Sequence, residues 1–554
     1  MMHKYFARRP WNVFSELIAH YSFPGELILD PFCGGGTTVV ESMKLGRRAI
    51  GVDSNSLATY ITEMECRLTN RVLLRDAFLW LTRSVKPAIC SLYHTTCRIC
   101  GGDAFDDWIQ WDEERRQMIK VKYTCPKCER SQECPPRKVD IVLAAELDRD
   151  FAEIIRAHHL WFPRTPIPRG DKTDSLLRKN VSHFHQLFTK RNLTALSMLS
   201  KSIENIKDTN TREFLEFALS GSLKWASRQS HLRGQIVEGW AMHAYWIYPK
   251  TLEINVWNIF EKRARSILRG KKYHEENIGA SRLGMSYADL VNGRADCLIL
   301  NRSSSSLPIP DDSVHAIITD PPYGNNVNYG ELSDFWYVWT SKGKLTDKAL
   351  EVVINRTQGK TLADYENLLY LVFKECYRVL KQRRYLVCTF NSRDLRVVTS
   401  FIMAVSRSGF ELHPKGLLYQ SPIRAYATTM HAMQIGAFVG DFIFTFVKGD
   451  QPTEQIHRQD QPRELRKQVP DLIVKGLRTK MTEVEIRRSA YSELIPFVAR
   501  YARSDPQACR AIADSFESLM SESDDYFRKQ RMKIVERRRN VFRKDSCRDF
   551  TLAK

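Results

Sequence analysis

A glycine-rich loop between a strand and a helix constrains the fold of this chain more than any other part of its sequence. The loop, DPFCGGGTT at residues 30–38, follows the apolar run 27–29, which predicts a buried strand. A helix is expected after the loop, and residues 48–52 predict a second strand that ends at Asp53. A strand, loop, helix and strand in this order form the first half of a doubly wound α/β sheet of the nucleotide-binding kind.

The residue types of this unit suit a nucleotide-like ligand. Glycines let the backbone approach a ligand closely, and the first turn of the following helix offers N–H groups that can hold a carboxylate. Asp53, at the end of the second strand, is placed to accept hydrogen bonds from two ribose hydroxyls. A structural turn followed by an ordinary surface Asp is the alternative interpretation, which the strand and helix context disfavours.

The remaining sequence predicts an interrupted sheet. Strand patterns return at 298–300, 316–319, 385–390 and 442–446, after a long block of cysteine pairs and helical segments. We therefore predict an α/β protein with a Rossmann-like doubly wound sheet, in which an inserted block separates the two halves. The expected segments are 1–80 (first half, with the loop), 81–285 (inserted ribbon and helices), 286–449 (second half) and 450–554 (basic helical tail).

The tetrapeptide Asp320-Pro321-Pro322-Tyr323 follows an apolar run, so we expect it at the carboxyl end of a strand, where open α/β sheets bind ligands. The amino nitrogen of adenine or cytosine is a poor nucleophile, because its lone pair is delocalised into the ring. Asp320 and the Pro321 carbonyl would accept its two hydrogens, and the rigid proline pair would fix both acceptors. Tyr323 would stack on a base taken out of the duplex. A proline-rich turn after a core strand is the alternative interpretation.

Both motifs resemble those of the amino-group DNA methyltransferases, which transfer a methyl group from S-adenosylmethionine to adenine N6 or cytosine N4. The loop at 30–38 is similar to the cofactor loop of that family. Residues 8–12 and the apolar helix after them resemble the motif that closes over the methionine end of the cofactor. Asp296 resembles the acidic residue that reads the cofactor adenine, with a surface Asp at a turn as the alternative. The resemblance implies these cofactor-binding residues: Pro10, Trp11, Asp30, Pro31, Phe32, Gly34, Gly36, Thr37, Thr38, Asp53 and Asp296.

A longer stretch, residues 319–339, resembles a subset of large adenine-specific DNA methylases that also carry a zinc ribbon. Residues 253–257, with Phe260 and Glu261, are similar to the same group. The resemblance covers about two thirds of the chain and excludes the part after Gly449. The chain departs from the family at residues 379–384, where a glycine turn is usual.

Two cysteine pairs predict a structural zinc site. Cys97 with Cys100, and Cys125 with Cys128, have the two-residue spacing that lets both thiolates of a knuckle bind one tetrahedral Zn²⁺. Residues 119–123 predict a strand of the ribbon, and Cys134 is a possible alternative ligand. A redox dithiol or free thiols are the alternatives.

The net charge favours a polyanionic partner. The formal charge is +20, an excess of Lys and Arg that attracts nucleic acid, although a basic and inert surface is the alternative. Aromatic and cationic residues that could contact DNA alternate in the ribbon: Trp108, Trp111, Arg115, Arg116, Lys120 and Lys122. A basic tail could lie along DNA or be only a solvated helix: Arg528, Lys529, Arg531, Lys533, Arg537, Arg538, Arg539, Arg543 and Lys544. We find no long apolar run or signal peptide, and expect a cytoplasmic protein without a membrane segment.

The leading hypothesis is a DNA methyltransferase that uses S-adenosylmethionine and acts on adenine N6 in double-stranded DNA. Asp heads the tetrapeptide more usually in the adenine enzymes of the family, and Ser in the cytosine enzymes. A restriction–modification or anti-phage setting is expected. No GxxxxGK[ST] loop occurs, so DNA cleavage or translocation would need other subunits. The alternatives are an N4-cytosine enzyme, a tRNA guanine-N2 methyltransferase with a similar loop and tetrapeptide, and a catalytically silent DNA-binding subunit.

Overall fold

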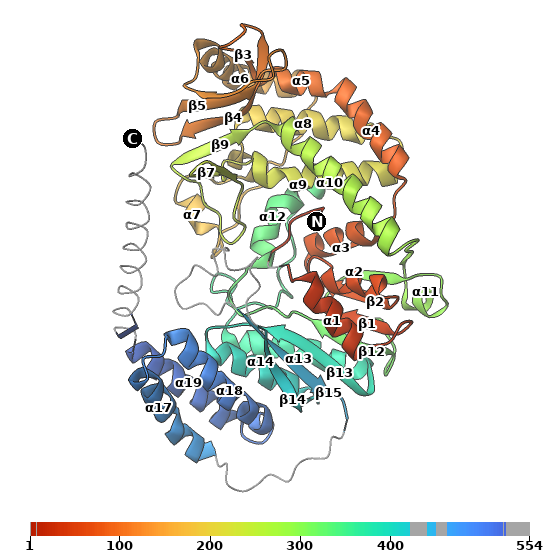
Figure 1. Cartoon of the computed structure of the whole chain (residues 1–554), viewed down its shortest axis with the longest axis vertical. Helices are drawn as coiled ribbons and strands as arrows, with labels where there is room; N and C mark the ends of the chain where they lie inside the picture. Colours follow the sequence, from red (N-terminus) through yellow and green to blue (C-terminus); the bar gives the residue numbers. More distant parts are fainter. Residues whose placement is uncertain (1, 7, 421–439, 450–461, 524–525, 528–554) are drawn as a thin grey trace, which may run out of the picture. The chain divides into compact units, whose positions relative to one another are not determined.

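The structure, a computed structural model, describes residues 2–6, 8–420, 440–449, 462–523 and 526–527. The chain forms two compact units (Figure 1). The first contains residues 1–304, 327–351 and 355–359, and the second contains residues 305–326, 352–354 and 360–554. The division into four segments along the sequence stays a prediction about domain organisation.

Parallel strands carry the glycine loop in the first unit. Their order is β10 (Leu283–Gly284), β11 (Cys297–Asn301), β2 (Arg48–Asp53), β1 (Leu27–Asp30). The residues of β1 are all buried, as expected for a parallel strand that is covered on both faces. Helix α2 (Thr37–Lys44) connects β1 to β2, and α3 (Ser56–Cys66) packs on β2 and β11. Helix α1 (Trp11–Tyr21) packs on α2, and the short α11 (Tyr287–Val291) lies beside β10 and β11.

A small antiparallel sheet forms the ribbon of the inserted block. It contains β3 (His94–Thr96), β4 (Asp103–Asp112), β5 (Gln117–Thr124) and β6 (Ser131–Cys134), in that order. Strand β9 (Lys250–Ile254), which is distant in sequence, pairs with β4 from Trp108 to Asp112. This pairing joins the ribbon to the helices that follow, because β9 runs directly into the next long helix.

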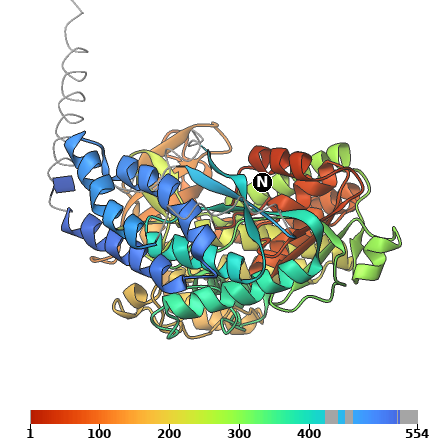
Figure 2. The same cartoon turned by 90° about the horizontal axis from the view of Figure 1, so that it is seen from below.

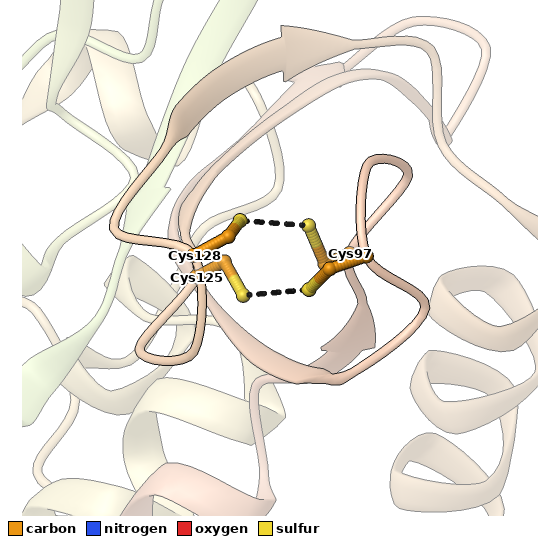
Figure 3. A group of neighbouring side chains, drawn as sticks. Cys97, Cys125 and Cys128 are labelled. Atoms are coloured by element: carbon orange, nitrogen blue, oxygen red, sulfur yellow. Dashed lines mark hydrogen bonds between the residues drawn. The ribbon is translucent and has the colours of Figure 1, made fainter.

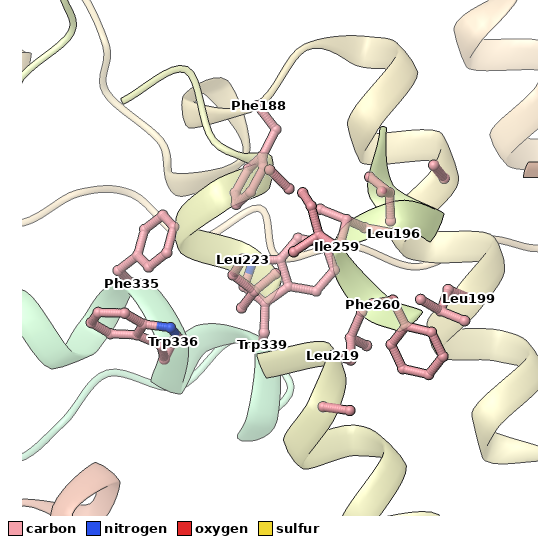
Figure 4. Packing of buried hydrophobic residues seen from close by; sticks show 14 of the residues in the cluster. Phe188, Leu196, Leu199, Leu219, Leu223, Ile259, Phe260, Phe335, Trp336 and Trp339 are labelled. Carbon is pink, nitrogen blue, oxygen red and sulfur yellow. The ribbon is translucent and has the colours of Figure 1, made fainter. Parts of the chain in front are cut away.

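Long helices pack around an aromatic core in the same unit. They are α4 (Arg71–Ser84), α5 (Lys86–Ser91), α6 (Lys138–Ala157), α8 (Lys190–Glu204), α9 (Thr209–Ala226), α10 (Val256–Asn277) and α12 (Tyr329–Thr340), with the short α7 (Asp174–Leu177) and the hairpin β7 (His231–Arg233) and β8 (Ile236–Glu238) between them. The side chains of Thr189, Asp208 and Asn255 accept backbone N–H groups at the starts of α8, α9 and α10. Figure 4 shows Leu223, Phe260 and Trp336 from three of these helices meeting in the core.

Helices and mixed strands carry the tetrapeptide in the second unit. The strand order is β12 (Val314–Thr319), β13 (Leu380–Phe390), β15 (Asp441–Val447), β14 (Glu411–Gln420). Only the β12–β13 pair is parallel, and the other two pairs are antiparallel. Helices α13 (Leu362–Val379) and α14 (Leu395–Arg407) contact each other. At the departure from the family pattern, Arg383 adopts φ +59°, a conformation that favours glycine.

Three C-terminal helices belong to the second unit. Helices α17 (Pro462–Arg478), α18 (Glu483–Tyr501) and α19 (Pro506–Glu522) lie beside one another, drawn in blue in Figures 1 and 2. The α/β class, the mixed sheet and the C-terminal helices agree with the fold predicted from the sequence, which is confirmed at this level. Among the described residues, no helix has both the length and the apolar composition needed to cross a bilayer.

A buried arginine joins two of these helices, α18 and α19. Arg487 of α18 is 5% exposed and pairs with Glu483 at 3.1 Å and Glu517 of α19 at 2.8 Å. It also donates a hydrogen bond to the carbonyl of Arg393, at the end of β13, over 2.8 Å. One guanidinium therefore connects α18, α19 and the segment that leads into α14.

We expect Arg487→Met to lower the local unfolding free energy of α18 and α19 by about 3 kcal/mol, because Glu517 loses its cation and Glu483 keeps only Arg393. Hydrogen exchange of the amides in these helices measures this quantity. The control is Arg488→Met, the exposed neighbour, for which we expect a change within about 0.5 kcal/mol. Equal amide protection in the Arg487→Met and Arg488→Met variants would contradict the role of Arg487 in joining α18 to α19.

Candidate active site

The glycine loop has backbone geometry that only glycine tolerates. Asp30 ends β1, and its Oδ1 accepts the N–H of Phe32 at 3.1 Å. Gly36 has φ +79°, and a Cβ there would lie 2.9 Å from the side chain of Thr62. Gly34, with φ +48°, donates its N–H to Oδ2 of Asp53 over 3.0 Å. The loop therefore passes tightly over the end of the neighbouring strand before α2 begins at Thr37.

Asp53 is a half-buried acceptor at the end of β2. Its Oδ1 accepts the N–H of Asn55 at 2.8 Å, in addition to the bond from Gly34. Burial raises the pKa of Asp53 to about 7; the two N–H groups lower it, and the charges of Asp30 and Glu351 raise it further. This carboxylate therefore changes its charge near neutral pH.

The register of the strands brings three polar residues to one edge. Asn301 is opposite Asp53, so β2 and β11 end level with one another, and Asp30, opposite residue 51, ends β1 two residues earlier. We call these strand ends, with the glycine loop, the cofactor edge, because the sequence predicts cofactor binding there. Asn301 donates from Nδ2 to the carbonyl of Asp53 over 3.2 Å. Sequence analysis missed Asn301, although its place at the end of a predicted strand was a usable signal.

Asp296 lies at the opposite end of the same strand. It precedes Cys297, the first residue of β11, and accepts the backbone N–H of Arg282 at 2.8 Å. Parallel sheets bind ligands at the carboxyl ends of their strands. The structure therefore does not bring Asp296 to the cofactor edge, because Asp296 and Asn301 lie at opposite ends of β11 with residues 297–300 between them.

The N-terminal segment reaches the loop through Tyr5 and, of the expected residues 8–12, through Arg8, whose Cδ would be 3.4 Å from a Cβ at Gly35. Pro10 precedes α1, and Trp11 is 59% exposed, with Nζ of Lys44 4.5 Å from its ring centroid. Lys44 ends α2, whereas the glycine loop lies at the start of that helix. Tyr5, which sequence analysis missed, is buried, and its ring would be 3.0 Å from a Cβ at Gly34.

The other predicted loop residues lie where the sequence placed them. The carbonyl of Pro31 accepts a hydrogen bond from the Ser304 hydroxyl over 2.6 Å, and Phe32 is half-buried. Thr37 and Thr38 form the first turn of α2, and Thr38 is buried. The hydrogen bond from Ser304 fixes the strand end before the loop, and α2 begins directly after the loop at Thr37.

Helix α12 packs against the cofactor edge. Asn55 caps α3 and donates from Nδ2 to the hydroxyl of Ser333 on α12 over 2.8 Å. At the start of α12, the ring of Tyr329 stacks on Tyr5, with their centroids 6.1 Å apart. The Ser-Asp-Phe sequence at 333–335, which contributes to the family resemblance, therefore has a positioning role here.

The tetrapeptide follows β12 in the second unit, as expected. Oδ1 of Asp320 accepts the hydroxyl of Thr389 at 2.6 Å and also the hydroxyl of Tyr323. The ring of Tyr323 lies 4.8 Å from that of Phe390. Thr389 and Phe390 end β13, the parallel neighbour of β12, so two strand ends position this carboxylate.

Further contacts fix the backbone of the tetrapeptide. The hydroxyl of Tyr365 on α13 donates to the carbonyl of Pro322 over 2.6 Å. The carbonyl of Gly324, at φ +63°, accepts the N–H of Ile354 at 3.2 Å. Pro321 is buried between these anchored neighbours. Sequence analysis missed Thr389 and Tyr365, because both act from elements that are distant along the chain.

The cysteine pairs converge in the ribbon (Figure 3). The Sγ atoms of all four lie within 4.8 Å of one another, with Cys97 to Cys128 and Cys100 to Cys125 each 3.6 Å apart. Thiolates about 2.3 Å from one tetrahedral Zn²⁺ would be roughly 3.8 Å apart, so this set fits the ion. Hydrogen bonds from the backbone N–H groups of Cys100 and Ile99 lower the pKa of Cys97 to about 6. Cys134 lies outside this group.

The aromatic residues of the ribbon have structural contacts. Trp108 is 5% exposed within the core, and Nε1 of Trp111 donates to Glu253 over 2.8 Å. Lys120 and Lys122 pair with Glu133, while Arg115 and Arg116 are exposed in the turn between β4 and β5. Of the expected DNA-contacting residues, Trp108 is therefore the least accessible. The basic tail from Arg528 to Lys544 lies outside the described residues.

Comparison with known families gives the class to which these features correspond. A family model described as DNA methylase, of the N6-adenine and N4-cytosine type, matches residues 2–64. This segment contains Tyr5, the glycine loop and Asp53. The resemblance to amino-group DNA methyltransferases that the sequence predicted is confirmed.

A particular relative agrees with this class. The Type II methyltransferase M.MjaII of Methanocaldococcus jannaschii is 19% identical to the chain over 353 residues. The match covers 60% of this chain and 58% of that protein, so the chain spans less than two thirds of its relative. Neither comparison distinguishes adenine from cytosine as the target base.

We expect the purified protein to contain about one zinc ion per chain, and Cys97→Ser or Cys125→Ser to lose it, because a closed structural site needs all of its ligands. Metal analysis by mass spectrometry measures the content. The control is Cys134→Ser, a buried thiol of the same ribbon outside the four-sulfur group. Equal zinc loss in the control, or none in the ligand variants, would contradict the ligand set.

We expect affinity for S-adenosylhomocysteine to fall about tenfold from pH 8 to pH 6, because Asp53, with a pKa of about 7, loses the charge that accepts ribose hydroxyls. The pKa of Asp53 is higher in the folded protein than in the unfolded chain. The protonated carboxyl therefore stabilises the free protein at low pH, and this contribution is lost as the pH rises through about 7. Calorimetric titration measures the affinity. Asp53→Asn should bind more weakly at pH 8 and show little pH dependence. Wild-type affinity in that variant would exclude the role of Asp53.

Proposed function

We propose that this protein is an S-adenosylmethionine-dependent methyltransferase that methylates the exocyclic N6 of adenine in double-stranded DNA. The observation that carries the proposal is the position of Asp320 at the end of β12, held by Thr389 and followed by a rigid proline pair. A fixed carboxylate beside a fixed backbone carbonyl suits an amino group with two hydrogens. The glycine loop and Asp53 support the choice of cofactor.

Binding of the target base would rearrange the contacts of Asp320. Its Oδ1 already accepts two hydroxyls, which occupy both of its lone pairs. An amino group that uses this oxygen must therefore displace a hydroxyl, and Tyr323 is the one that belongs to the tetrapeptide. We infer that Tyr323 exchanges its hydrogen bond for stacking on the extruded base, while Thr389 keeps the carboxylate oriented.

The reaction would then be a direct transfer. S-adenosylmethionine, when bound, supplies an electrophilic methyl group on a sulfonium. Asp320 and the Pro321 carbonyl would favour the tetrahedral form of the amino nitrogen, which exposes its lone pair. Asp320 would accept the proton that the nitrogen loses and release it to solvent.

Other residues support the remaining parts of the proposal. Asp at the head of the tetrapeptide favours adenine over cytosine, within the resemblance described above. The four-cysteine group would hold a structural Zn²⁺ in the ribbon. A restriction–modification or anti-phage role, in the cytoplasm and with a nuclease or other subunit as partner, is the setting we propose for such an enzyme.

We expect Asp320→Ala to lower methyl transfer to unmethylated duplex DNA at least a hundredfold, because the acceptor of the amino hydrogen is lost. Thr389→Val should lose activity less, and Tyr323→Phe should retain more activity than Tyr323→Ala, since the ring can still stack. Transfer of labelled methyl from S-adenosylmethionine, with identification of the modified nucleoside by mass, measures each effect.

Bulk tRNA is the parallel substrate, and Asp514→Ala, an exposed acid on α19, is the matched control that should keep full activity. Label on N4 of cytosine would correct the base. Label only on tRNA would replace DNA as the substrate. No transfer to either would indicate a catalytically silent subunit.

A further inference from the structure

A buried lysine in the first unit lacks a hydrogen-bond partner. Lys224, on α9, is 8% exposed, and Nζ lies 5.1 Å from the ring centroid of Trp225. Within the described part of the chain, no hydrogen bond or ion pair of its ammonium group is found. Nζ itself is not among the fully enclosed atoms without a partner, so solvent still reaches it; its partial desolvation is unfavourable, because no protein acceptor offsets it. Burial accordingly lowers the pKa of Lys224 to about 8.

An arginine from the neighbouring helix adds a second unpaired cation. Gly221 precedes Lys224 by one helical turn, so both lie on the same face of α9. A Cβ at Gly221 would be 3.3 Å from Cδ of Arg263 on α10 and 3.3 Å from the ring of His3. The absence of a side chain at Gly221 therefore gives Arg263 its place beside Lys224. Nε of Arg263 is buried and has no hydrogen-bond partner among the described residues.

The surrounding charges are mostly positive. The charges of Lys4 and Arg263 lower the pKa of Lys224 in addition to burial, and the charge of Glu238 raises it. Among the described residues, none of these three cations forms an ion pair. His3, buried beside them, has a pKa lowered to about 4, chiefly by burial. Three neighbouring cations repel one another; Lys4 is exposed, whereas the burial of Lys224 and of Nε of Arg263 reduces the solvent screening of their repulsion.

Such an arrangement is relieved by an anion. We propose that Lys4, Lys224 and Arg263 form a binding site for a phosphate group of the DNA backbone, an inference that rests on the proposed function. Lysine and arginine donors suit a phosphodiester, which stays ionised and offers two acceptor oxygens. Lys4 directly precedes Tyr5, whose ring contacts the glycine loop, so the site lies next to the cofactor edge. A phosphate held there would fix the register of the DNA strand on the first unit.

The test is the salt dependence of binding to a DNA duplex in the presence of S-adenosylhomocysteine. We expect Lys224→Met and Arg263→Gln each to lower the slope of log K against log [salt] by about 0.9, and to weaken binding roughly tenfold at low salt. The affinity for S-adenosylhomocysteine alone should not change. Lys224→Met should also have a melting temperature equal to or above that of the wild type, because it removes the repulsion.

The matched control is Lys272→Gln, a cation on α10 that already pairs with Glu276 at 3.6 Å, for which the slope should not change. Wild-type DNA binding with unaltered slopes in both site variants would overturn the phosphate site and leave the proposed function intact. Weaker binding of S-adenosylhomocysteine in these variants would assign the anion to the cofactor carboxylate and also overturn it. Failure of the wild type to bind or methylate DNA would instead refute the proposed function.

Discussion

The carboxylate of Asp53 is the group on which the geometry of the cofactor edge depends. It accepts the N–H of Gly34 from the glycine loop and the N–H of Asn55 from the start of α3. Asn55 extends this connection to Ser333 on α12. One half-buried acceptor at the end of β2 therefore positions a loop and, through its neighbour, two helices. Its raised pKa follows from the same burial, so precise positioning and sensitivity to pH have a common origin.

Helix α12 explains how the inserted block becomes part of the same unit as the cofactor edge. Glu331 on this helix is 5% exposed and accepts the N–H of Lys172 at 2.8 Å and Nδ2 of Asn355 at 2.6 Å. These bonds join segments that are far apart in sequence, and a buried carboxylate of this kind is unfavourable unless its acceptor sites are satisfied. Along the chain, only residues 324–326 separate the tetrapeptide from the first unit.

The sequence predicted the parts of the site that depend on local pattern. Asp30, Asp53 and Asp320 follow short apolar runs, and the ends of β1, β2 and β12 agree with those predictions. Long-range contacts were not predictable: Tyr5 reaches Gly34, and Thr389 reaches Asp320, from elements whose approach depends on tertiary packing. Motif matching chose Asp296 by its residue type, whereas strand register places Asn301 at the ligand-binding edge. Similarly, alternation in the ribbon does not reveal which face is covered, and Trp108 is on the covered one.

The net charge of +20 is a poor guide to where nucleic acid binds, because it counts paired and unpaired cations alike. Arg487 is neutralised by Glu483 and Glu517, and Arg378 by Glu375 and Asp311, so these cations serve the fold. A cation contributes to polyanion binding when its field is not cancelled by a neighbouring carboxylate. Lys224 and Arg263 meet this condition within the described residues, and they are also partly removed from water, which strengthens their field. Unsatisfied cations, rather than basic stretches of sequence, are therefore the better guide to a phosphate-binding surface in this protein.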